Sequence, residues 1–210
     1  MAQGPDFETL AQASIGHRIA LPAPRERGPI SVEEATARRR SLREFASDAL
    51  SLPEIAQLLW SAAGITSREG LRAAPSAGAR YPLETYLACE HGLFHYHLKD
   101  HALVKAQADD PRGPLAAAAY GQSFIAEAAV SLIFVALYQR TTSRYGDRGI
   151  RYVHMDIGHA AQNVHLQAVA LGLGSVPVGA FDDTAVADIL RLPQDHKPVY
   201  IVPVGHPARG

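Results

Sequence analysis

The sequence predicts an α+β fold in which helices flank a mixed central sheet. Two observations favour this fold class. Segments with a helical period of apolar residues alternate along the chain with short β-branched and aromatic runs that are typical of buried strands. Residues 152–171 are apolar on nearly every side, which indicates a long buried helix, central in the fold or at an interface between subunits. With 210 residues, the chain suits one domain with one core.

Two units are expected along the chain, an N-terminal arm over residues 1–30 and a single domain over residues 31–210. The arm is rich in Pro, Gly and Arg and shows no sustained period. We therefore expect it to cross the surface of the chain or of a partner subunit, and not to fold separately.

The elements of the domain follow from capping, periodicity and turn residues. Two capping boxes, each a serine followed three residues later by a glutamate, predict helices that begin at Ser31 and Ser51. His91 and Gly92 mark the turn of a β-hairpin. The predicted helices cover residues 31–37, 51–64, 115–120, 152–171 and 184–190, and the predicted strands cover residues 83–89, 93–98, 130–138 and 198–204.

Composition argues against two classes of partner. The net charge of -1 gives no electrostatic reason to expect nucleic acid or an anionic membrane. No apolar run reaches the roughly 20 residues that a membrane-spanning helix needs. The single cysteine, Cys89, cannot form an internal disulfide, so a reducing, cytoplasmic location is expected.

No metal site is predicted. His91, His95, His97 and His101 lie near one another in the sequence, but no carboxylate or thiolate accompanies them at ligand spacing. Surface histidines explain the pattern adequately.

The basic segment after the first predicted helix is a candidate anion site. Arg39, Arg40 and Arg43 stand close to Ser41, and like charges at this spacing repel unless an anion balances them. A phosphate accepts hydrogen bonds from both Arg and Ser, and in an extended segment Arg43 points to the same side as Arg39 and Ser41. Taken alone, the segment is better explained as a solvated basic turn.

A loop of small residues precedes the hairpin. Pro75, Ser76, Ala77 and Gly78 have small side chains, so their backbone N–H groups can approach a flat ligand. A plain turn explains the loop equally well.

A polar stripe runs along the longest predicted helix. Asp156, His159, Asn163 and Gln167 recur at spacings of three and four on an otherwise apolar segment. Buried polar groups need partners, so the stripe is expected to pair across a subunit interface or to line a cavity.

Three motifs in this order resemble those of the nitroreductase superfamily, and most of all its SagB-type dehydrogenase branch. The resemblance covers about residues 31–207. The motifs are residues 39–45, residues 75–84, and residues 158–163 together with 171–177.

The resemblance implies a two-fold homodimer with one flavin mononucleotide (FMN) at each of two sites that both subunits build. Arg39 and Ser41 would hold the phosphate with Arg40 beside them, and Arg209 would add to this phosphate site. Arg43 would lie near flavin N1 and the C2 oxygen, where a positive charge stabilises the anionic reduced flavin.

The same resemblance assigns the flavin ring to two backbone segments. The loop of Pro75, Ser76, Ala77 and Gly78 would pack on the ring, from the other subunit. A second segment would offer backbone N–H groups near N5, the atom that takes the hydride; it consists of Pro177, Val178, Gly179 and Ala180.

Arg144 and Tyr145 are the candidate catalytic residues. Related enzymes that oxidise azoline rings in modified peptides commonly present a lysine-tyrosine pair at this place, whereas this chain has Arg144 before Tyr145. Arginine is very hard to deprotonate and cannot serve as a general base, while Tyr145 can donate or accept a proton.

Three functions are compatible with these residues. The first is an FMN-dependent oxidoreductase of SagB type, which transfers a hydride between flavin N5 and a small molecule or a modified peptide. The second is an NAD(P)H-dependent nitro- or quinone-reductase, with NAD(P)H as electron donor. The third is a flavin-binding, non-catalytic subunit of a biosynthetic complex.

Overall fold

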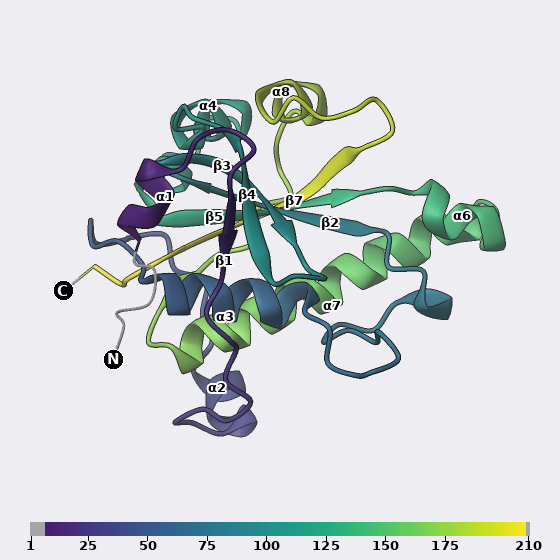
Figure 1. The fold of residues 1–210 in the computed structure, drawn as a ribbon, viewed down its shortest axis with the longest axis horizontal. Helices are drawn as coiled ribbons and strands as arrows, with labels where there is room; N and C mark the ends of the chain where they lie inside the picture. Colours follow the sequence, from purple (N-terminus) through teal and green to yellow (C-terminus); the bar gives the residue numbers. More distant parts are fainter. Residues whose placement is uncertain (1–6, 209–210) are drawn as a thin grey trace.

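Seven strands form one sheet between two layers of helices in the computed structural model, which describes residues 7–208 (Figure 1). The strand order is β1-β4-β3-β2-β5-β7-β6. The strands are β1 (Arg18–Ala20), β2 (Leu83–Cys89), β3 (Gly92–His97), β4 (Ala102–Gln107), β5 (Val130–Ala136), β6 (Gly174–Ser175) and β7 (Lys197–Gly205).

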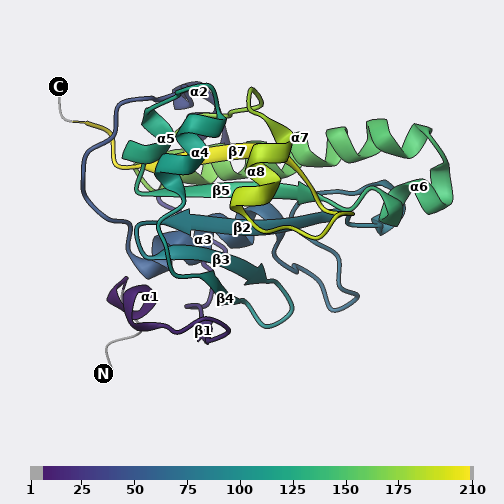
Figure 2. The same cartoon turned by 90° about the horizontal axis from the view of Figure 1, so that it is seen from above.

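Helices cover both faces of this sheet. Two helices, α3 and α7, pack below it as drawn in Figure 1, and α4, α5 and α8 lie above it; Figure 2 shows the upper layer from the front. The helices are α1 (Glu8–Gln12), α2 (Val32–Arg38), α3 (Leu52–Ala63), α4 (Arg112–Ala118), α5 (Phe124–Glu127), α6 (Gln139–Tyr145), α7 (Arg148–Ala170) and α8 (Asp183–Ile189), with a 3₁₀ turn η1 (Ala77–Ala79). The predicted α+β class is confirmed.

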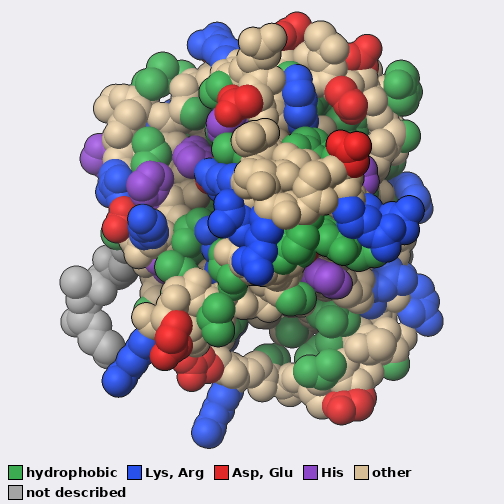
Figure 3. Space-filling view, turned by 90° about the vertical axis from the view of Figure 1, so that its right-hand side faces the viewer, with side chains coloured by type: hydrophobic (Ala, Val, Ile, Leu, Met, Phe, Trp, Pro, Cys, Tyr) green, Lys and Arg blue, Asp and Glu red, His purple; other side chains and the backbone are tan. Residues whose placement is uncertain are grey.

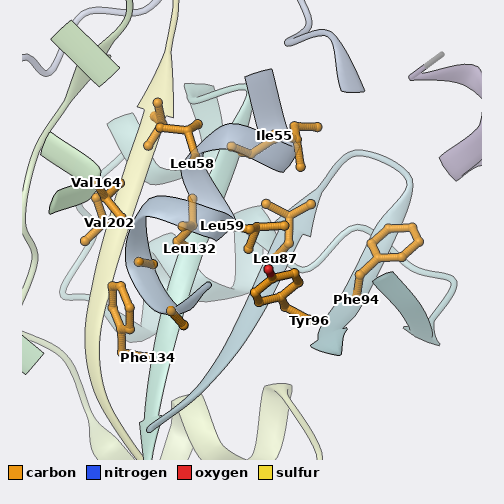
Figure 4. Close-up of a cluster of buried hydrophobic side chains, with 14 of the residues drawn as sticks. Ile55, Leu58, Leu59, Leu87, Phe94, Tyr96, Leu132, Phe134, Val164 and Val202 are labelled. Carbon is orange, nitrogen blue, oxygen red and sulfur yellow. The ribbon is translucent and has the colours of Figure 1, made fainter. Parts of the chain in front are cut away.

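Strand β5 joins the two halves of the core. All seven of its residues are buried, and its side chains alternate between the two layers. Leu132 and Phe134 belong to the cluster with α3 and α7 (Figure 4), whereas Ile133 and Val135 belong to the cluster with α4, α5 and α8. A continuous apolar run was therefore a correct indication of a central strand.

Local signals fixed the starts of two helices as predicted. The Ser31 hydroxyl accepts the Glu34 N–H, and Ser51 with Glu54 forms a complete capping box. Helix α2 ends at Arg38, so the basic segment begins where the helix stops.

Seven elements within residues 7–208 were not predicted from the sequence: α1, β1, β4, α5, α6, β6 and η1. Strand β1 lies inside the predicted arm and pairs with β4, so this part of the chain belongs to the sheet and does not merely cross a surface. Strand β4 was missed because Lys105 interrupts its apolar pattern. This lysine is nevertheless buried, with 4% of its surface exposed, and it donates to the Leu10 carbonyl. Helix α6 was also missed, because the strand predicted to reach Tyr138 ends at Ala136.

The sheet is less mixed than predicted. The six pairings between described strands are all antiparallel. In the described part of the chain, parallel pairing is limited to an isolated bridge between Ser41 and Ser175.

Helix α7 is buried on one face and not all round. Arg151, Met155, Gly158 and Gln162 lie on its other face and are exposed, Met155 to 51%. Within residues 7–208, no helix combines the length and the apolar character that crossing a bilayer requires.

An ion network ties β2, β3 and α6 together. Glu84 on β2 contacts Arg140 at 2.6 Å and His95 at 3.0 Å. Burial alone would raise the pKa of Glu84, but the hydrogen bonds from His95 and Arg140 outweigh it and lower the pKa to about 2.

Replacing Glu84 by Gln should therefore remove a stabilisation that depends on pH. The folded-state pKa lies below the unfolded one, so the stabilisation is complete above pH 4.5 and is lost as pH falls towards 2. We expect Glu84→Gln to unfold more easily than the wild type by roughly 2 kcal/mol at pH 7, with the gap closing below pH 4.5. Urea unfolding at several pH values measures this. Glu127→Gln, at an exposed carboxylate, is the control; a gap for Glu84→Gln that does not change with pH would contradict the assignment.

Candidate functional site

The basic segment is brought beside the chain that follows α7. Ser41 forms its parallel bridge with Ser175 of β6, and the Leu42 N–H donates to the Ser175 carbonyl at 3.1 Å. Residues 177–180 follow β6 directly. Two of the predicted cofactor segments, more than 130 positions apart in the sequence, therefore lie side by side.

Arg39, Ser41 and Arg43 offer donors without a neutralising carboxylate. Neither arginine has a carboxylate within 4.0 Å among residues 7–208, and the Arg43 guanidinium lies 5.8 Å from the centre of the Phe124 ring. Ser41 and Arg43 are exposed. Two guanidinium groups and a hydroxyl within five consecutive residues suit a phosphate monoester, so the donors present fit the phosphate of FMN.

Arg40 differs from its neighbours. Its Nη1 donates to the carbonyls of Ala37 at 3.0 Å and Arg39 at 2.7 Å. These are carbonyls at the C-terminal end of α2, where basic side chains commonly cap a helix. Arg40 thus caps the end of α2 in this structure, and its role in binding the cofactor stays a prediction. Arg209 lies outside the described residues.

The segment after β6 offers fewer backbone donors than predicted. Pro177 has no N–H, and the Val178 N–H donates to the Ile201 carbonyl at 2.8 Å. The Gly179 and Ala180 N–H groups donate to no other described residue, and Gln122 holds the Ala180 carbonyl at 3.0 Å. Gly179 and Ala180 therefore remain the donors for a ligand.

His165 supports this arrangement from inside and was not singled out in the sequence. Its Nδ1 lies 2.8 Å from the Ser175 hydroxyl. Burial, together with the charge of Arg39, lowers the pKa of His165 to about 4. The imidazole is therefore neutral at pH 7. A histidine at the edge of the buried face of α7 was the available signal.

The loop of small residues is anchored to α7. The Ser76 hydroxyl donates to the Asp156 carboxylate at 2.6 Å and accepts the Tyr81 N–H at 2.9 Å. Burial raises the pKa of Asp156, although hydrogen bonds from Ser76 and the Ala77 backbone act in the opposite direction. Pro75 is exposed next to this anchor. The hydrogen bonds of Ser76 hold the loop in a defined position against α7.

Arg144 and Tyr145 lie against this loop. Gly78 has a φ of 59°, and a Cβ there would lie 2.5 Å from the Tyr145 hydroxyl oxygen and 3.3 Å from Arg144 Nη1. The Arg144 guanidinium lies 5.4 Å from the centre of the Tyr145 ring. The structure therefore brings both predicted catalytic residues to the predicted ring-binding loop, and the positive φ with this close approach favours glycine at position 78.

Asn163 and Gln167 of the polar stripe line a cavity of about 300 Å³, one of the two arrangements predicted for it, and the stripe is also largely hydrogen-bonded inside the chain. Asn163 donates to the Ser61 carbonyl at 3.1 Å, and Gln167 accepts from Gln57 at 3.1 Å. With Asp156 held by Ser76, His159 is the exposed member.

The two halves of the candidate site stand on opposite sides of α7. The loop is anchored at Asp156, and the basic segment lies by His165. Nine residues make two and a half helical turns, which places these side chains on opposite sides of the helix and about 13 Å apart along it. One chain does not bring its loop and its basic segment together.

The histidines near the hairpin are held by other groups of the chain. Among residues 7–208, no three His, Cys, Asp or Glu side chains come together in a metal-binding group. His95 contacts Glu84, and the His101 ring contacts the Pro22 carbonyl at 2.9 Å.

Comparisons with known proteins place the chain in a family. Residues 36–206 match the model of the Nitroreductase family. The "Putative nitroreductase MJ1384" of Methanocaldococcus jannaschii is 44% identical over 182 residues, which are 84% of this chain and 91% of that protein. The NADPH-flavin oxidoreductase of Vibrio harveyi is 30% identical over 114 residues, 50% of this chain and 48% of that protein.

The fold agrees with this match. The crystal structure of a "putative nitroreductase" from Ralstonia eutropha JMP134 superposes with a TM-score of 0.84 at 30% identity, and covers 92% of this chain and 90% of that one. The matched region contains the basic segment, the loop and the segment after β6. The chain belongs to the nitroreductase family.

Proposed function

We propose that this chain is an FMN-dependent oxidoreductase of SagB type that transfers a hydride between flavin N5 and a small molecule or a modified peptide. The observation that carries the proposal is the pairing of the basic segment, through Ser41 and Leu42, with Ser175, four residues before the open amide of Gly179; Arg39 and Arg43 lack carboxylate partners among the described residues. Cationic donors for a phosphate therefore lie next to backbone donors for a ring.

Each group has a separate task in this proposal. Arg39 and Ser41 bind the phosphate, and Arg43 places a fixed positive charge near the ring. Gly179 and Ala180 orient the ring through their N–H groups. FMN, when bound, supplies the atom that accepts or gives the hydride. Tyr145 holds or releases a proton beside the loop.

We further propose that two copies form a two-fold homodimer and that the loop of Pro75 to Gly78 completes the site of the other copy. The support is geometric, since the loop and the basic segment face away from each other across α7. The exposed face of α7, with Met155 and Gly158, provides a surface on which a second copy can pack.

A second candidate function is an NAD(P)H-dependent reductase. Arg144 stands where azoline-oxidising relatives commonly have lysine, and arginine cannot act as a general base. The similarity to a protein named NADPH-flavin oxidoreductase also favours this alternative. Both candidates require FMN, and they differ in what reduces it.

Binding of FMN should depend on Arg39 and not on its neighbour Arg38. Removing a charge-assisted donor to phosphate should weaken binding about tenfold to a hundredfold in Arg39→Ala. Arg38 is exposed and pairs with Glu34 at 2.7 Å, so Arg38→Ala is the matched control and should bind as the wild type does. Fluorescence titration with FMN measures both. Equal affinity in Arg39→Ala and Arg38→Ala, or a wild type that never binds FMN, would remove the proposed site.

Complementation between two defective variants should reveal a site shared by two copies. Gly78→Val places a side chain against Tyr145 at a positive φ, so it should spoil the loop, while Arg39→Ala spoils the phosphate contacts. Co-expressed with different tags, the mixed dimer should contain one intact site and bind about half the FMN of the wild type. A pair of differently tagged Arg39→Ala chains is the control. Mixed dimers that bind no more than this control would show that each site is built from one chain.

Anaerobic stopped-flow reduction should separate the two candidate functions. For the leading proposal, an azoline-containing peptide should bleach the oxidised FMN, and NADH or NADPH should not. Tyr145→Phe should slow this step roughly a hundredfold if Tyr145 moves the proton, whereas Tyr120→Phe, at a 73% exposed tyrosine, should not. Rapid bleaching by NADPH would favour the reductase, and no bleaching by any of these reagents would favour the non-catalytic subunit.

A further inference from the structure

A basic hollow lies at the end of the molecule that carries α6. Figure 3 looks onto this end, where Lys and Arg side chains gather around the middle and acidic ones lie mostly above and below. The hollow has a volume of about 520 Å³, which is within the range of small-molecule sites. Its walls come from the loop after α3, the segment between η1 and β2, β2, β3 with the turn after it, α6 and the chain before β7.

The charges on these walls do not balance. Arg72, Arg80, Lys99 and Arg140 line the hollow, and Glu84 is the one carboxylate among the lining residues. Three histidines also line the hollow. His95 contacts Glu84 at 3.0 Å, His97 contacts Asp100 at 3.2 Å, and His196 contacts Asp195 at 2.9 Å. Asp100 and Asp195 are not among the lining residues.

Glu84 forms a close ion pair with one of these four permanent cations. It holds Arg140 at 2.6 Å, and no ion pair within 4.0 Å forms at Arg72, Arg80 or Lys99 with any described residue. Arg80 donates to the Arg140 carbonyl at 2.7 Å and to the Ser143 hydroxyl. This fixes one guanidinium at the rim of the hollow without cancelling its charge.

Arg72 is the most unusual of the three. Its side chain is half-buried, its guanidinium lies 4.3 Å from the centre of the Tyr81 ring, and it makes no side-chain hydrogen bond to another described residue. Burial lowers the pKa of Arg72, with Arg140 acting in the same direction and Glu84 against it. A half-buried cation without a carboxylate partner is costly, and an anion in the hollow would offset that cost.

Backbone strain points to the same wall. Ala79 and Tyr81 have positive φ values of 52° and 48°, which non-glycine residues seldom adopt. Such strain gathers at binding sites, where surrounding contacts hold it in place. Here it presents the Tyr81 ring to Arg72 and turns Arg80 towards α6.

We propose that this hollow is a binding site for the carboxylate or phosphate group of a small-molecule anion, held by Arg72, Arg80 and Lys99. Two arginine forks and one ammonium match the oxygen atoms of either group. Glu84 lowers the affinity of the hollow for an anion, because its carboxylate pairs with Arg140 and repels a second negative group. Arg72 and Tyr81 also border the small cavity beneath Pro75 and Ser76, so the bound anion lies beside the loop. The site does not depend on flavin binding.

Isothermal titration calorimetry with FMN-saturated protein tests the site, because FMN fills the phosphate donors of the basic segment. The probes are inorganic phosphate and citrate at low ionic strength. We expect at least one of them to bind, and the triple variant Arg72→Gln, Arg80→Gln, Lys99→Gln to weaken binding at least tenfold. Glu84→Gln should tighten binding several-fold. Thermal melting first confirms that each variant is folded.

Arg68→Gln is the matched control, since this exposed arginine lies in the same loop as Arg72 but outside the hollow. It should bind each probe as the wild type does. Binding of phosphate alone identifies a phosphate site, and binding of citrate alone identifies a carboxylate site. The proposal is overturned if neither probe binds, if the triple variant binds as tightly as the wild type, or if Arg68→Gln weakens binding equally. If the protein binds no FMN, the same variants titrated without it still test the hollow.

Discussion

The burial of one face of α7 against the sheet fixes the position of both halves of the candidate site. Val164 and Ala168 pack in the core on that face, so the helix cannot rotate without exposing them. Asp156 and His165 stand at the two edges of the buried face. The first holds Ser76, and the second contacts Ser175. A packing constraint on apolar residues therefore decides where the polar groups of two loops are placed.

Charged side chains with a close partner of opposite charge hold the fold together, whereas arginines without one mark candidate binding surfaces. Where charge is needed to hold elements together, it is paired, as Glu84 and Arg140 are between β2 and α6. Arg39, Arg43 and Arg72 lack such partners among the described residues, although each lies against other chain segments. An unpaired guanidinium contributes little to the free energy of folding, whereas it contributes strongly to the free energy of binding an anion. The lack of a close carboxylate partner therefore identifies a candidate anion-binding surface better than the number of basic residues does.

Sequence reasoning succeeded where the signal was local. The capping box at Ser51 and the apolar run of β5 depend on residues a few positions apart, and both were predicted. Strand β4 was missed because a buried lysine, Lys105, interrupts its apolar pattern, and its partner is a carbonyl nearly a hundred residues away. The partners of Asn163 on α7 were likewise distant in sequence. The motifs identified the basic segment, but only the fold showed that Arg40 turns back to the end of α2.

His165 shows how the fold can prepare a site for an anion without adding charge to it. A protonated imidazole beside Arg39 would add a second cation, this one buried, and both burial and the charge of Arg39 oppose this. The ring therefore stays neutral, and its contact with the Ser175 hydroxyl fixes the short strand β6. Because Ser41 bridges to Ser175 of β6, the ring also helps to position the basic segment. The arginines carry the positive charge for the anion, while the buried histidine only fixes the position of β6 and of the basic segment beside it.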